Sequence, residues 1–349
     1  MRRPMHEIVD LRSDTVTRPT PAMRKAMAQA EVGDDVFDDD PTVHQLQQLA
    51  AQITGKEAAL FMPSGTMSNT VAICVHTQPG DEILLDTEAH SMLYEVGAPA
   101  RLAHVLTRTF PSKEGVPCFE EIERSLHIAS LHSPRTALLV LENTHNRAGG
   151  YPIPIEVHQR LYALCQAHHV RIHIDGARIF NASIATNTPV AQFAACADSL
   201  TFCLSKGLGC PIGSVLCGSY EFIQQAKRVR KMLGGGMRQV GILAAAGIYA
   251  LQHHIERLAE DHRRARLLAQ NIAGAPGILV ENPNPPTNMV YFQTQAPADA
   301  FVERLKTDHH VLCHATSPHR IRLVTHLDVD DDDIDHAAQA ICTVSKVLH

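Results

Sequence analysis

The stretches RIHIDGARIF (residues 171–180) and SLTFCLSKG (199–207) decide how this chain folds. Each opens with a short, mainly apolar run, typical of a strand that is buried on both faces. Asp175 and Lys206 stand where these two predicted strands end. Ligands of open α/β sheets collect at the carboxyl ends of the strands, so we expect both side chains in one crevice.

Similar apolar runs lie on both sides of these two stretches and alternate with helix-compatible segments such as 155–169. This alternation predicts a layered α/β domain with a mostly parallel sheet. The further predicted strands are AALFM (58–62), DEILLD (81–86), RLAHVL (101–106), TALLVLE (136–142) and GSVLCG (213–218).

The pattern changes in the last third of the chain. A helix predicted over 220–233 ends at three glycines, and a long helix is expected over 237–272. Three predicted strands and two predicted helices then indicate a compact α+β unit. The strands are NMVYFQT (288–294), HVLCHAT (310–316) and RIRLVTH (320–326), and the helices cover 298–308 and 333–348. We therefore expect an N-terminal arm over 1–40, a large domain over 41–250 and a small α+β domain over 251–349.

Composition argues against several classes of protein. The chain has 349 residues, 45% of them hydrophobic and 19% charged, and a formal net charge of −6. Without a basic run it is not expected to bind nucleic acid. No apolar stretch is long enough for a membrane span, and the first residues lack the apolar core of a signal peptide. Nine cysteines without a CxxC pair indicate reduced thiols and a cytoplasmic protein.

Metal binding has weak support in the sequence. HExxH and related spacings are absent, so we expect no catalytic metal. The acidic runs GDDVFDDDPT (33–42) and DVDDDDID (328–335) can each be a cation loop. We favour other interpretations. The first run is expected to be a solvated loop that caps a helix starting near Pro41, and the second to be the N-terminus of the last helix.

Lys206 and Asp175 together indicate a particular chemistry. A lysine in a crevice can form a Schiff base, and an aspartate beside it can hold a pyridinium N–H. Taken alone, the lysine is as easily an exposed side chain and the aspartate a helix cap. His90, just beyond another predicted strand, can stack on a cofactor ring or can be structural.

A phosphate site is the third requirement of such a cofactor. MPSGTMSN (62–69) joins a predicted strand to a helix, and Ser64, Gly65 and Thr66 offer donors and close backbone approach to an anion. The alternative is an ordinary turn in which Ser64 caps the helix. GLGCPIG (207–213) is not a dinucleotide fingerprint, because its third glycine is one place late and Pro211 prevents the required helix start.

Long, ordered motifs along nearly the whole chain resemble the low-specificity L-threonine aldolases, a pyridoxal-phosphate-dependent family. These motifs are DLRSDTVTRPT (10–20), VGDDVFDDDPTV (32–43), PSGTMSN (63–69), LENTHN (141–146), HIDGARIFNA (173–182), CLSKGLGCPIGS (203–214), KMLGGGMRQ (231–239) and RLVTHLDV (322–329). The resemblance implies fold type I, with a seven-stranded, mostly parallel large domain and a small C-terminal α+β domain.

The resemblance also implies site roles. Lys206 would hold pyridoxal phosphate covalently, Asp175 its ring nitrogen, and Ser64, Gly65 and Thr66 its phosphate, while His90 would stack on the ring. The remaining implied residues are Arg178 near the ring oxygen and substrate, Ser13 and Arg322 at the substrate carboxylate, Tyr94 near the substrate side chain, and Lys231 and Arg238 beside a neighbouring subunit's site. The family is typically a homotetramer with shared sites.

The activity expected from this resemblance is cleavage of L-threonine and L-allo-threonine to glycine and acetaldehyde. His90 or His132, directly or through a water, would remove the β-hydroxyl proton. Three alternatives stay open: β-elimination or transamination on the same cofactor, a non-catalytic cofactor-binding protein, and a scaffold without cofactor. Tyr94, often phenylalanine in relatives, and HNRAGG (145–150) can affect the choice of diastereomer.

Overall fold

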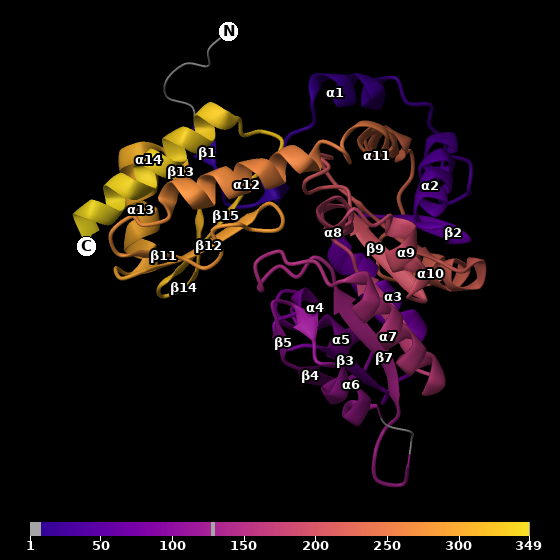
Figure 1. Cartoon of the computed structure of the whole chain (residues 1–349). Coiled ribbons are helices and arrows are strands. Elements are labelled where there is room, and N and C mark those ends of the chain that lie inside the picture. Colours follow the sequence, from indigo (N-terminus) through magenta and orange to yellow (C-terminus); the bar gives the residue numbers. More distant parts are fainter. Residues whose placement is uncertain (1–7, 127–129, 349) are drawn as a thin grey trace. The chain divides into compact units, whose positions relative to one another are not determined.

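A computed structural model describes residues 8–126 and 130–348 of the chain (Figure 1). The internal contacts of the described residues divide the chain into two compact units. One unit lies within residues 19–255, and the other joins residues 8–18 to residues 256–348.

A seven-stranded sheet forms the centre of the larger unit. Its strands follow the order β2 (Ala58–Met62), β10 (Ser214–Gly218), β9 (Ser199–Cys203), β8 (Arg171–Asp175), β7 (Thr136–Glu142), β3 (Glu82–Asp86) and β4 (Leu106–Phe110). β10 runs antiparallel to both of its neighbours, and the other pairs are parallel. The predicted seven-stranded, mostly parallel sheet is therefore confirmed.

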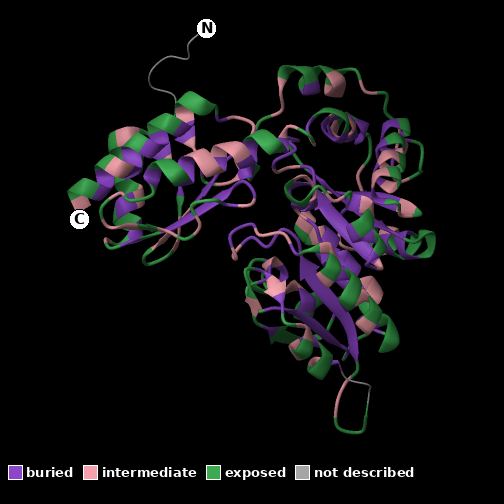
Figure 2. Ribbon diagram, viewed as in Figure 1, coloured by how far each residue is buried: buried purple, intermediate pink, exposed green. Residues whose placement is uncertain are grey.

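Both faces of this sheet are covered. All seven residues of β7 are buried, as Figure 2 shows along the strand. Alternate strand residues such as Leu60 and Val140 pack with helix α3 (Gly65–His76), while their neighbours Phe61 and Leu141 are also buried. Such burial of successive residues explains the nearly continuous apolar runs. Further helices of this unit are α2 (Pro41–Thr54), α5 (Ala98–Leu102), α7 (Ile155–Ala167), α9 (Val190–Ala195) and α10 (Tyr220–Met232).

Three predicted elements are wrong, and one of them is the strand expected over 310–316. It is divided into β13 (Val311–Leu312) and β14 (His314–Ser317), which belong to different sheets. Residues 101–106 do not form a strand, because Pro99 lies in the first turn of α5 and His104 turns the chain with φ = +56° before β4 begins. The helix expected over 237–272 is instead α11 (Gly241–His253) and α12 (Leu258–Ile272). Between them the Nδ1 atom of His254 lies 2.7 Å from the carbonyl oxygen of Leu208, a tertiary contact that helical periodicity does not predict.

The second unit is built on a four-stranded antiparallel sheet. Its order is β11 (Ile278–Val280), β12 (Met289–Thr294), β15 (Arg320–Val324) and β14 (His314–Ser317), with helices α12, α13 (Ala298–His309) and α14 (Asp331–Leu348). β1 (Val9–Asp10) pairs in parallel with β13 (Val311–Leu312). This pairing attaches the start of the chain to the C-terminal unit, whereas the sequence predicted a separate arm over 1–40.

Both acidic runs begin helices. The Oδ1 atom of Asp40 accepts hydrogen bonds from the backbone N–H groups of Thr42 and Val43 (both 3.1 Å) at the start of α2. Asp330 and Asp333 exchange backbone-to-carboxylate hydrogen bonds of 3.0 Å at the start of α14. These contacts confirm the predicted capping roles. The remaining elements are η1 (Asp14–Val16), α1 (Pro21–Ala28), α4 (His90–Leu93), β5 (Ser112–Lys113), β6 (Val116–Pro117), α6 (Phe119–Ser125) and α8 (Ile179–Thr186).

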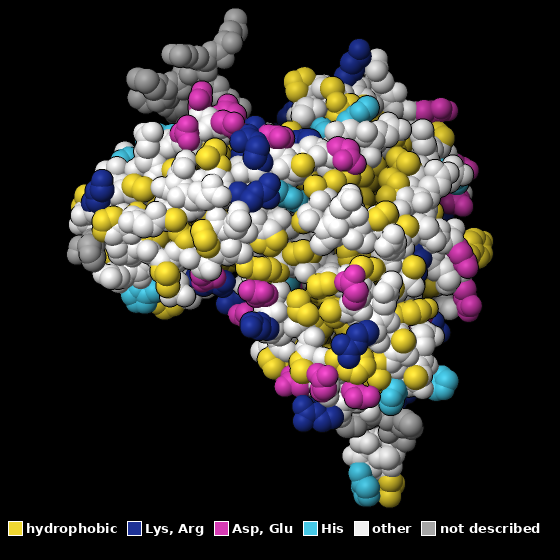
Figure 3. All heavy atoms as spheres, in the orientation of Figure 1, with side chains coloured by type: hydrophobic (Ala, Val, Ile, Leu, Met, Phe, Trp, Pro, Cys, Tyr) yellow, Lys and Arg dark blue, Asp and Glu magenta, His cyan; other side chains and the backbone are white. Residues whose placement is uncertain are grey.

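The surface carries charged side chains of both signs. Acidic and basic side chains are interspersed on the face in view in Figure 3. Among the described residues no helix has the length and apolar character needed to span a membrane. The nine cysteines, all of them described, are free thiols.

Candidate active site

Asp175 and Lys206 come from neighbouring strands of the large unit. Asp175 is the last residue of β8, and Lys206 follows β9 by three residues. The parallel register pairs Asp175 with Thr201 of β9 on one side and with Glu142 of β7 on the other. The carboxyl ends of three adjacent strands therefore present acidic and basic side chains at one edge of the sheet.

Asp175 is a buried carboxylate. It is 3% exposed, and its Oδ2 atom accepts a hydrogen bond of 2.8 Å from Nδ2 of Asn69. Burial works to raise the pKa of Asp175, but the positive charges of His90 and Lys206 and the Asn69 hydrogen bond outweigh it and lower this pKa. Asp175 thus stays ionised where a cationic ring nitrogen would need a partner.

The N-terminus of α3 lies beside the ends of these strands. Oγ of Ser64 accepts a hydrogen bond from the backbone N–H of Met67 (3.1 Å), so Ser64 does cap the helix. A Cβ atom on Gly65 would lie 2.8 Å from Sγ of Cys203, the last residue of β9. One turn further, Asn69 reaches Asp175, so α3 directs its N-terminus, with Thr66 exposed, toward the Asp175–Lys206 edge. A helix N-terminus is a favourable place for a phosphate.

The close approach of Gly65 to Cys203 gives a first test. Gly65→Ala should lower the free energy of unfolding by about 1–3 kcal/mol, because the added methyl group overlaps the Cys203 sulfur. Urea denaturation checks this, and the double variant Gly65→Ala/Cys203→Ala should recover most of the loss, with Cys203→Ala alone as control. Equal losses in the single Gly65 variant and the double variant would contradict this packing.

His90 is the first residue of α4. Its backbone N–H donates to Oε2 of Glu142 (2.7 Å), and its Nδ1 atom lies 2.9 Å from Oε1 of Glu95. The imidazole side chain is 30% exposed and lies near the ring of Tyr94, with 5.5 Å between ring centroids. Tyr94 is half exposed, and its hydroxyl oxygen accepts a hydrogen bond of 3.4 Å from Arg147. These contacts place an aromatic and imidazole surface beside Asp175.

A buried histidine, His145, contacts the last residue of the neighbouring strand β3. Nε2 of His145 lies 3.2 Å from Oδ1 of Asp86, and both side chains are buried. Burial works to lower the pKa of His145, but the charge of Glu142 and the interaction with Asp86 raise it above the ordinary value of 6.5.

The raised pKa of His145 predicts a pH-dependent stability. The folded protein binds this proton more tightly than the unfolded chain, so the contribution is fully present below about pH 6.5 and is lost as pH rises through the folded-state pKa. In urea unfolding at a series of pH values, His145→Gln should flatten the fall in stability above this pH. His168→Gln, at an exposed position directly after α7, is the control, and an unchanged slope in the His145 variant would contradict the assignment.

Arg178 and His132 occupy very different places. Arg178 is buried three residues after Asp175, at the start of α8. His132 is exposed in the loop before β7, at the amino end of a seven-residue strand whose carboxyl end carries Glu142. A strand of this length spans about 23 Å. Within one chain, the structure therefore does not bring His132 to the edge where Asp175 and His90 lie.

Ser13 and Arg322 belong to the other unit. Oγ of Ser13 caps η1 by accepting a hydrogen bond from the N–H of Thr15 (3.2 Å). Arg322 lies on β15, and its Nη2 atom donates to the carbonyl oxygen of Arg12 (3.0 Å). The structure thus places these two predicted substrate-binding residues in the same unit. Ser13 belongs to it because β1 pairs with β13.

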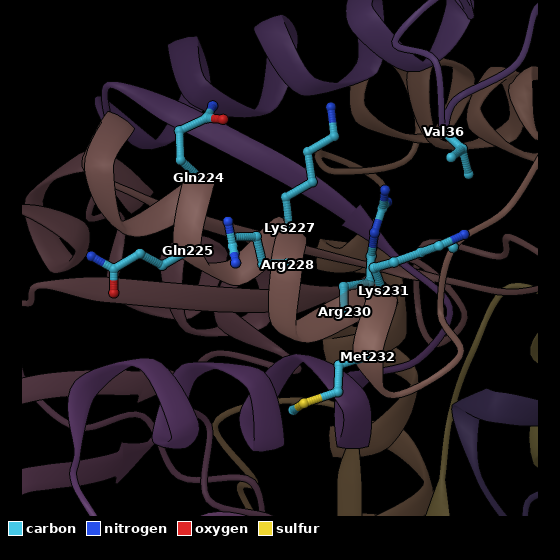
Figure 4. A pocket seen from close by; sticks show the side chains of 9 residues that line it. Val36, Gln224, Gln225, Lys227, Arg228, Arg230, Lys231 and Met232 are labelled. Carbon is cyan, nitrogen blue, oxygen red and sulfur yellow. The ribbon is translucent and has the colours of Figure 1, made fainter.

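Lys231 lines a basic cavity of about 780 Å³ in the large unit. Figure 4 shows Lys231 extending from α10 toward Val36, with Lys227 and Arg230 on the same helix. Arg238 forms an ion pair of 2.8 Å with Asp34. The exposed ammonium group of Lys231 leaves this cavity a positively charged surface.

Asn69, Glu95 and Glu142 were not predicted as site residues. Asn69 contacts Asp175, and Glu95 and Glu142 contact His90. Asn69 lies four positions after Gly65, so the two share a helix face, a signal that was present in PSGTMSN. Glu142 ends the fully buried strand β7, beside Asp175 in register. Glu95 follows α4 in an irregular segment, where spacing gives no indication of its contacts.

The chain is similar to proteins of a known family. Residues 10–295 match the family model described as beta-eliminating lyase. The chain is 43% identical to low-specificity L-threonine aldolase 1 of Arabidopsis thaliana, covering 97% of this chain and 98% of the relative. It is also 43% identical to the low specificity L-threonine aldolase of Escherichia coli (strain K12), covering 95% and 97%.

Solved structures share the fold at lower identity. Leishmania major threonine aldolase superposes with a TM-score of 0.81 at 19% identity, covering 98% of this chain and 100% of the other. Serine palmitoyltransferase of Sphingomonas wittichii gives a TM-score of 0.75 at 15% identity, covering 98% and 88%. The architecture is fold type I of the pyridoxal-phosphate enzymes, and the chain belongs to the beta-eliminating lyase family, among the low-specificity L-threonine aldolases.

Proposed function

We propose that this chain cleaves L-threonine and L-allo-threonine to glycine and acetaldehyde with pyridoxal phosphate as cofactor. The observation that carries the proposal is the meeting of Asp175, Lys206 and the N-terminus of α3 at one edge of the sheet. Its curated relatives, similar over nearly the whole chain, bear the name of this activity.

The described residues fit the cofactor. Asp175 is a buried, ionised carboxylate, suited to a protonated ring nitrogen. The absence of a side chain on Gly65, beside Cys203, opens the α3 N-terminus to a phosphate. Ser64 and Thr66 are exposed there with hydroxyl groups. Lys206, three residues beyond Cys203, would bind the cofactor's aldehyde, and the bound cofactor supplies an electron sink for the pair left on the α-carbon.

The chain's own residues would orient the substrate and move its protons. Arg178, Ser13 and Arg322 would hold the substrate carboxylate, so that the bond between the α- and β-carbons is the one that breaks. His90 would take the β-hydroxyl proton as that bond breaks and acetaldehyde leaves. The α-carbon then takes up a proton, and glycine is released. Tyr94 would contact the β-substituent.

A homotetramer with shared sites is part of the proposal. Lys231 and Arg238 would complete the site of a neighbouring copy, for which the basic cavity on α10 offers a positive surface. His132 would act as a base only from a neighbouring copy, because within one chain it lies at the opposite edge of the sheet. We place the enzyme in the cytoplasm, where its nine free thiols would stay reduced. We place the boundary between the large and the small domain near residue 250.

Incubation of the purified protein with pyridoxal phosphate and each isomer separately tests the activity. Glycine and acetaldehyde in equal amounts are expected with both isomers. β-Elimination is a second candidate, because the matching family model carries that name. It would release ammonia and a keto acid, and these products in place of glycine would overturn the aldolase assignment.

A further inference from the structure

One buried amide joins two carboxylates beneath the candidate site. Asn69 is 2% exposed, and its Nδ2 atom donates to Oε1 of Glu95 and to Oδ2 of Asp175, both at 2.8 Å. Both N–H bonds of this amide are therefore used. Its Oδ1 atom faces Nε2 of His173 at 3.1 Å, so His173 donates from Nε2.

The hydrogen bonds of His173 fix the orientation of this amide. Burial lowers the pKa of His173 to about 4, so the imidazole is neutral and carries one N–H. Its Nδ1 atom, 2.8 Å from Oγ of Ser199, then accepts. The two carboxylates give the same assignment independently: their oxygens accept, so the Asn69 nitrogen must face them and the Asn69 oxygen must face Nε2–H of His173.

Glu95 links this amide to His90. The Glu95 side chain is completely buried, and the Oε1 atom that accepts from Asn69 lies 2.9 Å from Nδ1 of His90. Its Oε2 atom has no hydrogen-bond partner among the described residues. An acceptor oxygen against Nδ1 requires the imidazole proton at Nδ1. Nε2 is then the ring nitrogen of His90 that can take a proton from a substrate.

We infer that Glu95 is a positioning residue for His90, fixing its ring and tautomer so that Nε2 is the basic atom, and that Asn69 ties this pair to Asp175. The inference rests on the proposed function, in which His90 and Asp175 both contact the cofactor ring. A base held by a buried carboxylate is a recurring arrangement in enzymes that transfer protons. His90, the proposed stacking residue, and Asp175, the proposed partner of the ring nitrogen, are thereby linked by hydrogen bonds through Glu95 and Asn69.

The surrounding charges act on the same pair. His90 is faced by Glu142 of β7, by Asp175 of β8 and by Lys206 after β9. Burial works to lower the pKa of His90, but the hydrogen bond to Glu95 and the charges of Asp175 and Glu95 raise it, against an opposing effect of Lys206. Burial and the charge of Asp175 raise the pKa of Glu95 in spite of its hydrogen bonds to His90 and Asn69.

Variants of Glu95 separate its charge from its hydrogen bond. Glu95→Gln keeps an oxygen that can accept from His90 and Asn69 but removes the charge that favours protonated His90. The acid limb of the pH profile of kcat should therefore move to lower pH. Glu95→Ala removes both and should lower kcat by about 10²-fold, the lower end of what a general base contributes. KM and the visible absorbance of the lysine-bound cofactor should change little in either variant.

A matched control distinguishes this role from general support of the fold. Glu82→Gln removes another buried carboxylate, bonded to Arg108 and Thr136 at the amino end of β3. It should leave the pH profile in place. A Glu95→Gln enzyme with an unshifted acid limb would overturn the inference.

A second measurement needs neither activity nor cofactor. In the cofactor-free wild-type protein, ¹⁵N NMR of the imidazoles, with His90 assigned through its loss in His90→Asn, should show the proton on Nδ1. A proton on Nε2 would overturn the inference even if the Glu95 variants fail to fold. Wild-type protein that has the Nδ1 tautomer but yields no glycine or acetaldehyde would refute the proposed function and leave the tautomer assignment standing.

Discussion

Lys206→Ala should remove the visible absorbance of the protein-bound cofactor and lower kcat by on the order of 10⁶-fold, as loss of a covalent nucleophile does. The expectation follows from the place of Lys206, which lies after β9 next to Asp175 and the N-terminus of α3. The measurement is an absorbance titration with pyridoxal phosphate together with an assay of glycine formation.

Lys56 provides the matched control for this variant. It is also half-buried in the large unit, burial lowers its pKa, and its Nζ atom donates to the carbonyl oxygen of Ala197 (2.5 Å). A lysine of lowered pKa is chemically competent to form a Schiff base, so Lys56 is a real competitor. Lys56→Ala should retain the absorbance and the activity. Loss of both in Lys56→Ala, with a normal Lys206→Ala protein, would reverse the assignment.

Asp175→Asn should retain the covalently bound cofactor while kcat falls by about 10²–10³-fold, the loss expected when one aligned electrostatic partner of the reacting centre is removed. The substitution keeps the shape of the side chain but removes the charge beside the ring nitrogen. In the wild-type protein Nδ2 of Asn69 donates a hydrogen bond to the Asp175 carboxylate, and the substitution places an amide there instead. Single-turnover rates and the absorbance spectrum measure the two effects separately.

Asp198→Asn is the control for the aspartate variant. Asp198 precedes β9 at the other edge of the sheet, where it accepts hydrogen bonds from the backbone N–H of Ile172 (2.8 Å) and from Arg171 (3.0 Å). Its replacement can reduce stability but should leave kcat within about twofold, since a surface or edge substitution away from the site changes little. An Asp175→Asn enzyme as fast as Asp198→Asn would show that Asp175 has no electrostatic role in the reaction.

The large sheet could be predicted because burial on both faces gives strands an unmistakable composition. AALFM and RIHID become β2 and β8 with the predicted bounds. The failures occur where a local signal is ambiguous. RLAHVL is apolar enough for a strand, but its first residues belong to α5, which has Pro99 in its first turn. The chain then turns at His104, and the strand β4 that follows is largely exposed.

Contacts between distant residues could not be predicted from spacing. Val9 pairs with Val311, and this pairing decides which unit contains the start of the chain. The position of Asp175 at the end of a strand could be predicted, because strand ends are visible in the sequence. The contact of Glu95 with His90 depends on the path of an irregular turn, so the sequence offered no indication of it.

The covalent bond to Lys206 is the claim on which the whole account depends. Borohydride reduction of the protein incubated with pyridoxal phosphate, followed by proteolysis and mass spectrometry, tests it directly. We expect a pyridoxyl group on the peptide that carries Lys206. An unmodified Lys206, or a pyridoxyl group on Lys56 in its place, would contradict the account.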